Sequence, residues 1–264
     1  MKIGFIGLGN MAKAMIGGML EKKIAQPEEI LGSARTQATL DAVSEEYGIL
    51  VSASNREVAD WAEILVLAVK PQMLAEVICE ITDSIRQETL LLSVAAGKTI
   101  AWIEEAFGGN YKVVRCIPNT TAMVGAGGSG VCRNERVSEE EMELCMALAG
   151  SFGMAREIPE KLIDAVGAVS GSSPAFVFMF IEALADSAVK AGMARKDAYH
   201  FAAQAVFGSA KLMLESGKHP GELKDMVCSP GGTTIEGVQA LEEMGFRASV
   251  MKAIEACVDK TRKL

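Results

Sequence analysis

Apolar runs alternate with helical patterns along the first half of the chain. Short apolar runs at residues 2–7, 29–34, 48–53, 63–69, 89–97 and 112–117 each predict a buried strand. Strands that are apolar on both faces are typical of a parallel sheet covered by helices on each side. We therefore expect an α/β domain with a doubly wound, mostly parallel sheet over residues 1–160.

The pattern becomes helical after about Ile158. The segment SPAFVFMFIEALADSAVKAG begins with Ser173 as N-cap and Pro174 as first helical residue, and it ends at Gly192. Its early turns are apolar on every side, which indicates burial, and we interpret the missing cover as a second subunit.

Further helical patterns complete the second half. They cover residues 196–216 and then run from residue 235 onward, with a break near Gly245. We expect residues 161–264 to form an all-α domain that joins two subunits.

Composition and charge narrow the class of protein. The 264 residues are 50% hydrophobic and 23% charged, as in ordinary globular proteins, and the net charge is −8. This acidic balance argues against a nucleic-acid partner. The start of the chain has no signal-peptide pattern, and the runs ILVLAV and AFVFMFI are too short to span a bilayer. We expect no membrane contact and a cytoplasmic location.

The six cysteines are scattered and have no C-x-x-C spacing. They are typical of small buried residues in a reducing compartment, so we expect neither disulfides nor a metal site.

A glycine motif follows the first predicted strand. Gly7-x-Gly9-x-x-Ala12 has the spacing of a dinucleotide fingerprint, with alanine in the third position. Gly7 allows a tight turn, Gly9 lets the backbone approach a pyrophosphate, and Ala12 lets the helix pack on the strand. We expect this turn to bind a dinucleotide.

The end of the second predicted strand indicates which dinucleotide. An NAD site places an acidic residue there, whereas this chain has Ser33 and Arg35. An arginine can pair with a 2′-phosphate through its planar guanidinium. The sequence favours NADPH, with NADH as an alternative cofactor.

No obvious acid/base residue accompanies this cofactor site. The two histidines, His200 and His219, lie in a helical pattern and in a turn before proline, and neither setting is catalytic. Reduction of a C=N bond that is already protonated needs little more than positioning and electrostatics. The stretch CSPGGTTIEGVQ, residues 228–239, offers backbone N–H groups and N-cap hydroxyls at a helix start, where a carboxylate can bind.

Several segments together resemble one family. HPGELKDMVCSPGGTTIEGVQALE, GLGNMAKAM, LAVKPQ, SVAAGKTI, RCIPNTTAMVGAG and VSGSSPAF are similar, in this order, to segments of the Δ1-pyrroline-5-carboxylate reductases. The resemblance covers essentially the whole chain. It implies a Rossmann domain followed by a helical dimerisation domain, a homodimer through the C-terminal helices, and in many members a decamer. It also implies NAD(P)H-dependent reduction of 1-pyrroline-5-carboxylate to L-proline, the last step of proline biosynthesis.

The resemblance also implies roles for matched residues on the cofactor side. The pyrophosphate turn would use Gly7, Gly9, Asn10 and Met11, and the 2′-phosphate would meet Ser33 and Arg35. The adenosine and ribose would lie beside Ala68, Val69, Lys70 and Pro71. The nicotinamide would lie beside Ala95, Ala96 and Gly97, and the junction with substrate would be formed by Pro118, Asn119 and Thr120.

On the substrate side, the implied carboxylate site is Gly231, Gly232, Thr233 and Thr234. Thr234 matches the family threonine near the ring nitrogen, as proton donor or orienting partner. Ser170 and Ser172 would form the opposite wall, while Ser173 caps the long helix. The pocket would lie where two subunits meet.

Three other functions stay open at this point. A β-hydroxyacid dehydrogenase would need a catalytic lysine soon after the SGSSP turn, and none occurs before Lys190. A reductase of another cyclic imine acid would use the same residues. A non-catalytic NADP-binding sensor would keep the glycine turn without needing SPGGTT.

Overall fold

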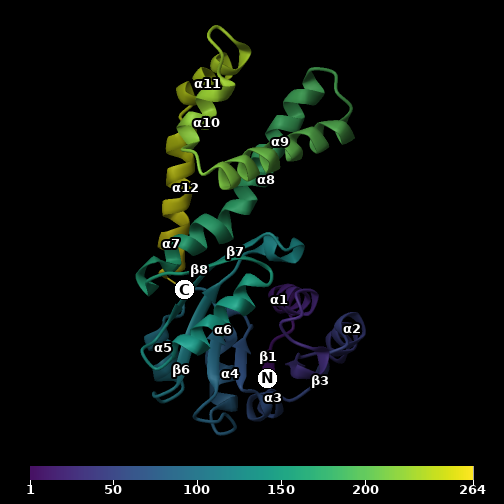
Figure 1. Ribbon diagram of the computed structural model, residues 1–264, viewed down its shortest axis with the longest axis vertical. Helices are drawn as coiled ribbons and strands as arrows, with labels where there is room; N and C mark the ends of the chain where they lie inside the picture. The colour runs from purple at the N-terminus through teal and green to yellow at the C-terminus, as the bar shows by residue number, and fades with distance from the viewer. Residues whose placement is uncertain (264) are drawn as a thin grey trace. The chain divides into compact units, whose positions relative to one another are not determined.

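The computed structural model describes residues 1–263 and has two compact units (Figure 1). The first contains Met1–Ser172 together with residues from Cys257 onward, and the second contains Ser173–Ala256. The expected division at residue 160 into a cofactor domain and a dimerisation domain is a functional one and stays a prediction.

The first unit is built on one eight-stranded sheet with the order β3-β2-β1-β4-β5-β6-β7-β8. The strands are β1 Ile3–Ile6, β2 Ile30–Ser33, β3 Leu50–Ser52, β4 Ile64–Leu67, β5 Leu90–Ser93, β6 Lys112–Ile117, β7 Gly127–Arg133 and β8 Gly153–Glu157. All neighbours are parallel except β6 and β7. The first six strands have the doubly wound order of a Rossmann fold, which confirms the expected fold class.

Helices cover both faces of this sheet (Figure 1). One face packs against α1 Asn10–Glu21, α2 Gln37–Tyr47 and α6 Glu139–Gly150. The other packs against α3 Asn55–Trp61, α4 Leu74–Ile81, α5 Ile100–Ala106 and α7 Ile163–Val166. This double cover explains why β1, β2, β4 and β5 are buried along their whole length.

Capping residues set the ends of several helices. Thr36 caps α2 by accepting a hydrogen bond from the Thr39 N–H, and Gly48 ends the helix in the left-handed region with φ 70°. Ser138 and Glu141 form a reciprocal capping box at the start of α6.

The strands β7 and β8 have no counterpart in the sequence analysis, because β7 (GGSGVCR) lacks an apolar run. Its glycines are explained by close packing, which leaves no room for side chains. A Cβ on Gly130 would come within 2.9 Å of Ile158 and 3.0 Å of Val166. A Cβ on Gly153, the partner of Gly127 in β8, would lie 2.1 Å from the Gly127 carbonyl oxygen. The close approach of backbones replaced the hydrophobic signal of a strand.

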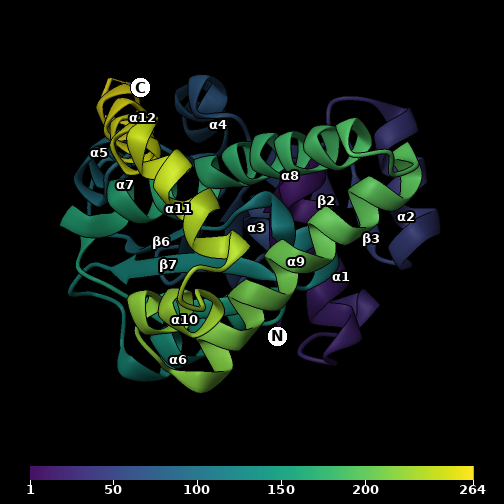
Figure 2. The ribbon, with the colours of Figure 1, turned by 90° about the horizontal axis from the view of Figure 1, so that it is seen from above.

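The second unit is all-helical, as expected. It contains α8 Ser173–Lys190, α9 Arg195–Ser216, α10 Pro220–Val227, α11 Thr233–Glu243 and most of α12 Phe246–Thr261. The break predicted near Gly245 is confirmed, since this glycine separates α11 from α12 with φ 72°. Helices α8 and α9 pack against each other toward the turn that joins them, around the buried Ala185, Ala198 and Ala202, and diverge away from it (Figure 2).

The beginning of α8 differs from the prediction. Ser173 is not an isolated N-cap, because α7, a π-helical segment at Gly167–Ser172 (η5) and α8 follow one another without a break. This run, Glu160–Lys190, is the helical stretch of the described chain that is long and apolar enough to cross a membrane, and 11% of its most apolar window is buried. The apolar run AFVFMFI is therefore part of a longer helix than its own length suggests.

Candidate active site

The predicted cofactor residues of β1, β2 and β4 meet at the carboxyl edge of the sheet. The Gly7 N–H donates to the Ser33 carbonyl at 3.0 Å, and the Ala68 N–H donates to the Ile6 carbonyl at 2.9 Å. Gly7 has φ +96°, and a Cβ there would lie 2.9 Å from the Ala68 carbonyl oxygen and 3.0 Å from Val69. The edge lies where the strand order reverses between β1 and β4, which is where ligands bind in such sheets.

The start of α1 is suited to an anionic group. Gly9 is its N-cap and has no side chain that could accept a hydrogen bond from the first turn. A Cβ on Gly9 would meet no protein atom within 4 Å, so protein packing does not require glycine there. Asn10 is exposed and Met11 is half-buried, and Ala12 is buried against the sheet. An open backbone at an uncapped helix start fits a dinucleotide pyrophosphate.

The end of β2 contains a hydrogen-bond chain that the sequence analysis missed. The buried Ser33 hydroxyl donates to Asn55 Oδ1 at 2.7 Å, and Asn55 Nδ2 donates to Glu80 Oε2 at 2.8 Å. Arg35 takes no part in these hydrogen bonds and is exposed. The Ser33 hydroxyl therefore already donates its proton to Asn55, whereas the Arg35 side chain is accessible to a phosphate.

The remaining cofactor residues lie on two neighbouring loops. Lys70 is exposed, Pro71 opens the short 3-10 turn Pro71–Met73 (η2) after β4, and Lys70 is its N-cap. Ala95, Ala96 and Gly97 follow β5, where Ala95 is buried and Gly97 has φ +74°. Contact of these residues with a cofactor stays a prediction.

The Asn119 amide bonds to groups of the protein. Asn119 follows β6, is 8% exposed, and donates from Nδ2 to the Ser170 carbonyl at 2.9 Å. Its Oδ1 accepts from the Gly128 N–H at 2.9 Å. Pro118 is buried beside it, and Thr120 is exposed at the start of the 3-10 turn Thr120–Val124 (η3). The structure thus joins the predicted junction to Ser170, which the sequence placed on the substrate wall.

Ser170 and Ser172 lie in the π-helical segment, both half-buried. The Ser170 hydroxyl donates to the Val166 carbonyl at 2.8 Å. Irregular π turns of this kind occur frequently at functional sites.

The predicted carboxylate site belongs to the second unit. Gly231 has φ +66°, which requires glycine, and Gly232 is the N-cap of α11 without a side-chain cap. Thr233 and Thr234 are therefore the first two helical residues and do not cap the helix, because Gly232 already occupies the cap position. Both threonines are exposed.

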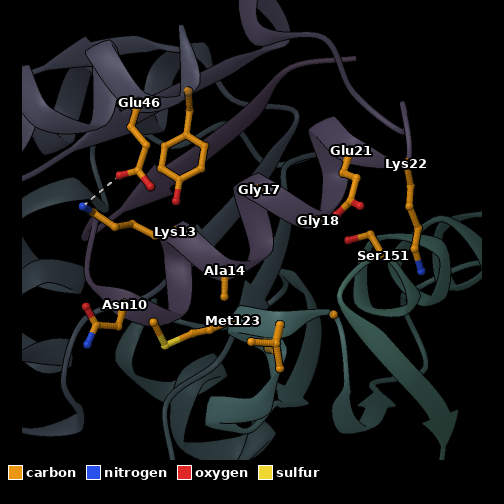
Figure 3. Close-up of a pocket in the computed structure, with 14 residues that line it drawn as sticks. Asn10, Lys13, Ala14, Gly17, Gly18, Glu21, Lys22, Glu46, Met123 and Ser151 are labelled. Atoms are coloured by element: carbon orange, nitrogen blue, oxygen red, sulfur yellow. Dashed lines mark hydrogen bonds and ion pairs between the residues drawn. The ribbon is translucent and has the colours of Figure 1, made fainter.

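A pocket of about 800 Å³ runs along α1 in the first unit (Figure 3). Asn10 lies at one end, Lys22 and Ser151 lie toward the other, and Met123 forms part of the floor. An ion pair between Lys13 and Glu46, at 3.4 Å, stands at one side. Asn10 is the one predicted site residue in its lining, so this pocket is not the switch-point edge described above.

Two thiols lie in the sheet below the Asn119 loop. Burial raises the pKa of Cys116 to about 12 and that of Cys132 to about 11. Both are protonated at neutral pH and are poor nucleophiles. Among residues 1–263, no cluster of three or more histidine, cysteine or acidic side chains could hold a metal ion.

Comparison with known proteins gives the family. Residues 160–264 match the family model for pyrroline-5-carboxylate reductase dimerisation, and residues 2–97 match that for NADP oxidoreductase, coenzyme F420-dependent. Pyrroline-5-carboxylate reductases from Escherichia coli and Methanosarcina acetivorans are 49% and 43% identical to the chain, covering 100% of it and 98% and 97% of their own lengths. The crystal structure of Plasmodium falciparum pyrroline carboxylate reductase with NADP bound is 33% identical, covers 99% of this chain and 97% of that one, and gives a TM-score of 0.89. This chain belongs to the pyrroline-5-carboxylate reductase family.

Proposed function

We propose that this protein reduces 1-pyrroline-5-carboxylate to L-proline with NADPH, the last step of proline biosynthesis. The observation that carries the proposal is the 49% identity to the Escherichia coli reductase over the full length of the chain. The solved Plasmodium falciparum relative with NADP bound supports the choice of cofactor. NADH is the alternative cofactor.

The first unit supplies the cofactor site in this proposal. The turn of Gly7, Gly9, Asn10 and Met11 holds the pyrophosphate, since its backbone is open and α1 is uncapped. Arg35 pairs with the 2′-phosphate beside Ser33. Ala68, Val69, Lys70 and Pro71 adjoin the ribose, and Ala95, Ala96 and Gly97 leave room for the nicotinamide ring, which supplies a hydride when bound.

The substrate carboxylate is bound by the SPGGTT segment. Gly231, Gly232 and Thr233 present N–H groups and a hydroxyl at the uncapped start of α11. The Thr234 hydroxyl bonds the ring nitrogen, while Ser170 and Ser172 form the opposite wall. No strong base is needed, because the imine is reduced in its protonated form and the protein acts by orientation.

Dimerisation completes this proposal. Residues 1–160 act as the cofactor domain, and residues 161–264 act as the dimerisation domain, in line with the family model that matches residues 160–264. The exposed apolar side chains of α8, Phe178 at 63% and Met179 at 68%, need cover, which a second copy of the chain supplies. We propose a dimer through the C-terminal helices, assembly of dimers into a decamer, and a soluble enzyme of the cytoplasm.

The direct test is NADPH oxidation by the purified protein with 1-pyrroline-5-carboxylate, followed by absorbance, with proline identified as product. Parallel reactions use NADH and a six-membered cyclic imine acid. Turnover to proline with NADPH supports the proposal. Binding of NADPH without oxidation would contradict it and favour an NADP sensor, and turnover of only the six-membered ring would assign another cyclic imine acid.

The 2′-phosphate contact has its own test, Arg35→Ala. Removal of one charged hydrogen-bond partner should lower kcat/KM with NADPH by about tenfold or more and leave kcat/KM with NADH within about twofold. Lys23→Ala, at an exposed position, is the control. An equal loss of kcat/KM with both cofactors would show that Arg35 does not bind the 2′-phosphate.

A further inference from the structure

Asn119 has its amide orientation fixed by two backbone groups. Its oxygen faces the Gly128 N–H at 2.9 Å, and its nitrogen faces the Ser170 carbonyl at 2.9 Å. A carbonyl can pair only with a donor and an N–H only with an acceptor, so the opposite rotamer would break both bonds. The side chain therefore connects β7 to the π-helical segment in one defined way.

Pro174 removes the ordinary α-helical donor for the Ser170 carbonyl. In an α-helix it would accept from the N–H of the residue four positions later, which is Pro174. Proline has no N–H, and its ring crowds that carbonyl. The chain widens into a π turn at Gly167–Ser172, and Asn119 Nδ2 provides the donor that Pro174 cannot.

The same residue organises the loop around it. Thr121 Oγ1 lies 3.0 Å from Asn119 Oδ1 and 2.7 Å from the Ala126 carbonyl, and its single proton favours the shorter contact. A Cβ on Gly128 would lie 3.7 Å from Ser170 Cβ, so the backbone of β7 passes close to the π turn. Asn119 thus holds together the loop after β6, the start of β7 and the π turn.

We propose that Asn119 is a positioning residue that sets the π turn carrying Ser170 and Ser172, and so the shape of the substrate wall. The inference rests on the proposed function, in which these serines face the substrate. It assigns Asn119 to substrate geometry through Ser170, in place of the cofactor contact that the family resemblance implies.

The test variant is Asn119→Asp. It keeps the side-chain size and the oxygen that accepts from Gly128, but it puts a carboxylate oxygen against the Ser170 carbonyl. We expect KM for 1-pyrroline-5-carboxylate to rise by about tenfold or more, because displaced serines would hold the substrate less well. The NADPH dissociation constant, measured by cofactor fluorescence, should change less than about twofold.

Pro174→Ala provides a rescue. Alanine supplies the missing N–H to the Ser170 carbonyl and removes the ring that crowds it. The KM of the double variant Asn119→Asp/Pro174→Ala should lie below that of Asn119→Asp. On a logarithmic scale it should recover at least half of the distance to the KM of Pro174→Ala alone. Strictly additive effects of the two substitutions would overturn the inference.

Asn134→Asp is the control for the change from amide to carboxylate. Asn134 Nδ2 donates to the Tyr111 carbonyl at 2.9 Å and to Glu104 Oε1 at 2.8 Å, and its Oδ1 accepts from the Val113 N–H at 3.2 Å, so this substitution disturbs its surroundings at least as strongly. It lies outside the candidate site, so the same chemical change should lower stability without raising KM. If Asn119→Asp does not fold, Asn119→Ser removes the donor without adding charge.

Hydrogen exchange separates this inference from the proposed function. Residues 166–172 should exchange faster in Asn119→Asp than in Asn134→Asp, whether or not the wild type reduces 1-pyrroline-5-carboxylate. Equal exchange in the two variants would overturn the inference, and so would weakened NADPH binding with an unchanged KM. Failure of the wild type to turn over, with faster exchange present, would refute the proposed substrate alone.

Discussion

The two glycines of the N-terminal turn meet different physical demands. Gly7 has φ +96° and no room for a Cβ beside Ala68, so the protein itself requires glycine there. Gly9 has φ −79°, and a Cβ on it would face open space. Protein packing does not require glycine at this position; glycine is a favoured N-cap residue, and a ligand that approaches the backbone would select it more strongly.

Gly9→Ala should therefore separate binding from folding. We expect the free energy of unfolding to fall by less than about 1 kcal/mol, the cost of alanine in place of glycine at an N-cap. The NADPH dissociation constant should rise about tenfold or more, because the new methyl group occupies space for the pyrophosphate. Cofactor fluorescence and urea unfolding measure the two effects.

Gly150→Ala is the control, since a Cβ there also meets no protein atom within 4 Å. It should leave cofactor affinity unchanged. Unchanged affinity in Gly9→Ala as well would show that the pyrophosphate does not approach this residue.

The residue scale also shows where sequence reasoning ends. The spacing Gly7-x-Gly9-x-x-Ala12 is local and could be interpreted directly. The partners of Ser33 and Asn119 lie 22 and 51 residues away, at Asn55 and Ser170, and no local pattern encodes such pairs. The structure shows the hydrogen bonds that these side chains make within the protein, and their contact with ligands stays a prediction.

At the scale of elements, β6 carries a buried charge that the start of a helix neutralises. Arg115 has 2% of its side chain exposed and donates to Glu160 Oε1 at 2.7 Å. The same carboxylate oxygen accepts from the Ile100 N–H at 2.7 Å, the first residue of α5. Glu160 thus links β6 and α5 to the beginning of the long helical run.

Glu160→Ala should destabilise the protein by about 3 kcal/mol, because it leaves the Arg115 guanidinium buried without its counter-ion. Arg115→Met with Glu160→Ala should recover most of this loss. Urea unfolding of the four proteins in this double-mutant cycle measures the coupling.

Glu139→Ala provides a comparison at an exposed pair. Glu139 pairs with Arg133 with 81% of its side chain exposed, so its loss should cost less than about 1 kcal/mol. A cost for Glu160→Ala no larger than this would show that water replaces the carboxylate around Arg115.

The sequence predicted some of these elements better than others. Six strands were predicted because each is a short apolar run. The edge strand β3 is the exception to the expected burial, since its residues are exposed or half-buried. The strand β7 was missed because its glycines, which leave room for the Phe152 carbonyl at Gly127 and for the Ile158 and Val166 side chains at Gly130, give no apolar run. The start of α8 at Ser173 lies within one residue of the prediction. The helical run that precedes it was missed, because Ser173-Pro174 has the pattern of an N-terminus whereas a π turn carries the helix through it.

At the scale of the whole molecule, apolar surface is concentrated on the helical unit. Phe178, Met179, Phe201, Phe207 and Leu214 are each at least 60% exposed, the last at 83%. The sequence indicated that α8 needs cover, since AFVFMFI is apolar on every side. The sequence does not indicate which side chains would cover it, because in the proposed dimer they belong to the partner subunit.

Phe178→Lys should convert the assembly to smaller species. A charge placed in an apolar interface must be desolvated, which costs several kcal/mol per interface. We expect the molar mass from light scattering to fall toward that of a monomer, with loss of turnover because the proposed pocket needs two subunits.

Leu50→Lys is the control, since Leu50 is an apolar residue of β3 that is 46% exposed in the first unit. It should keep the wild-type mass and activity. A wild-type mass in Phe178→Lys would exclude α8 from the interface between subunits.

The return of the residues from Cys257 onward to the first compact unit has a consequence for protein synthesis. A ribosome makes these residues after the whole of Ser173–Ala256, so the cofactor-binding unit acquires its last contacts only when the helices have already been translated. Maturation of the two units is therefore linked in time. A truncation that begins at residue 257 should therefore remove contacts of the first unit as well as the end of α12.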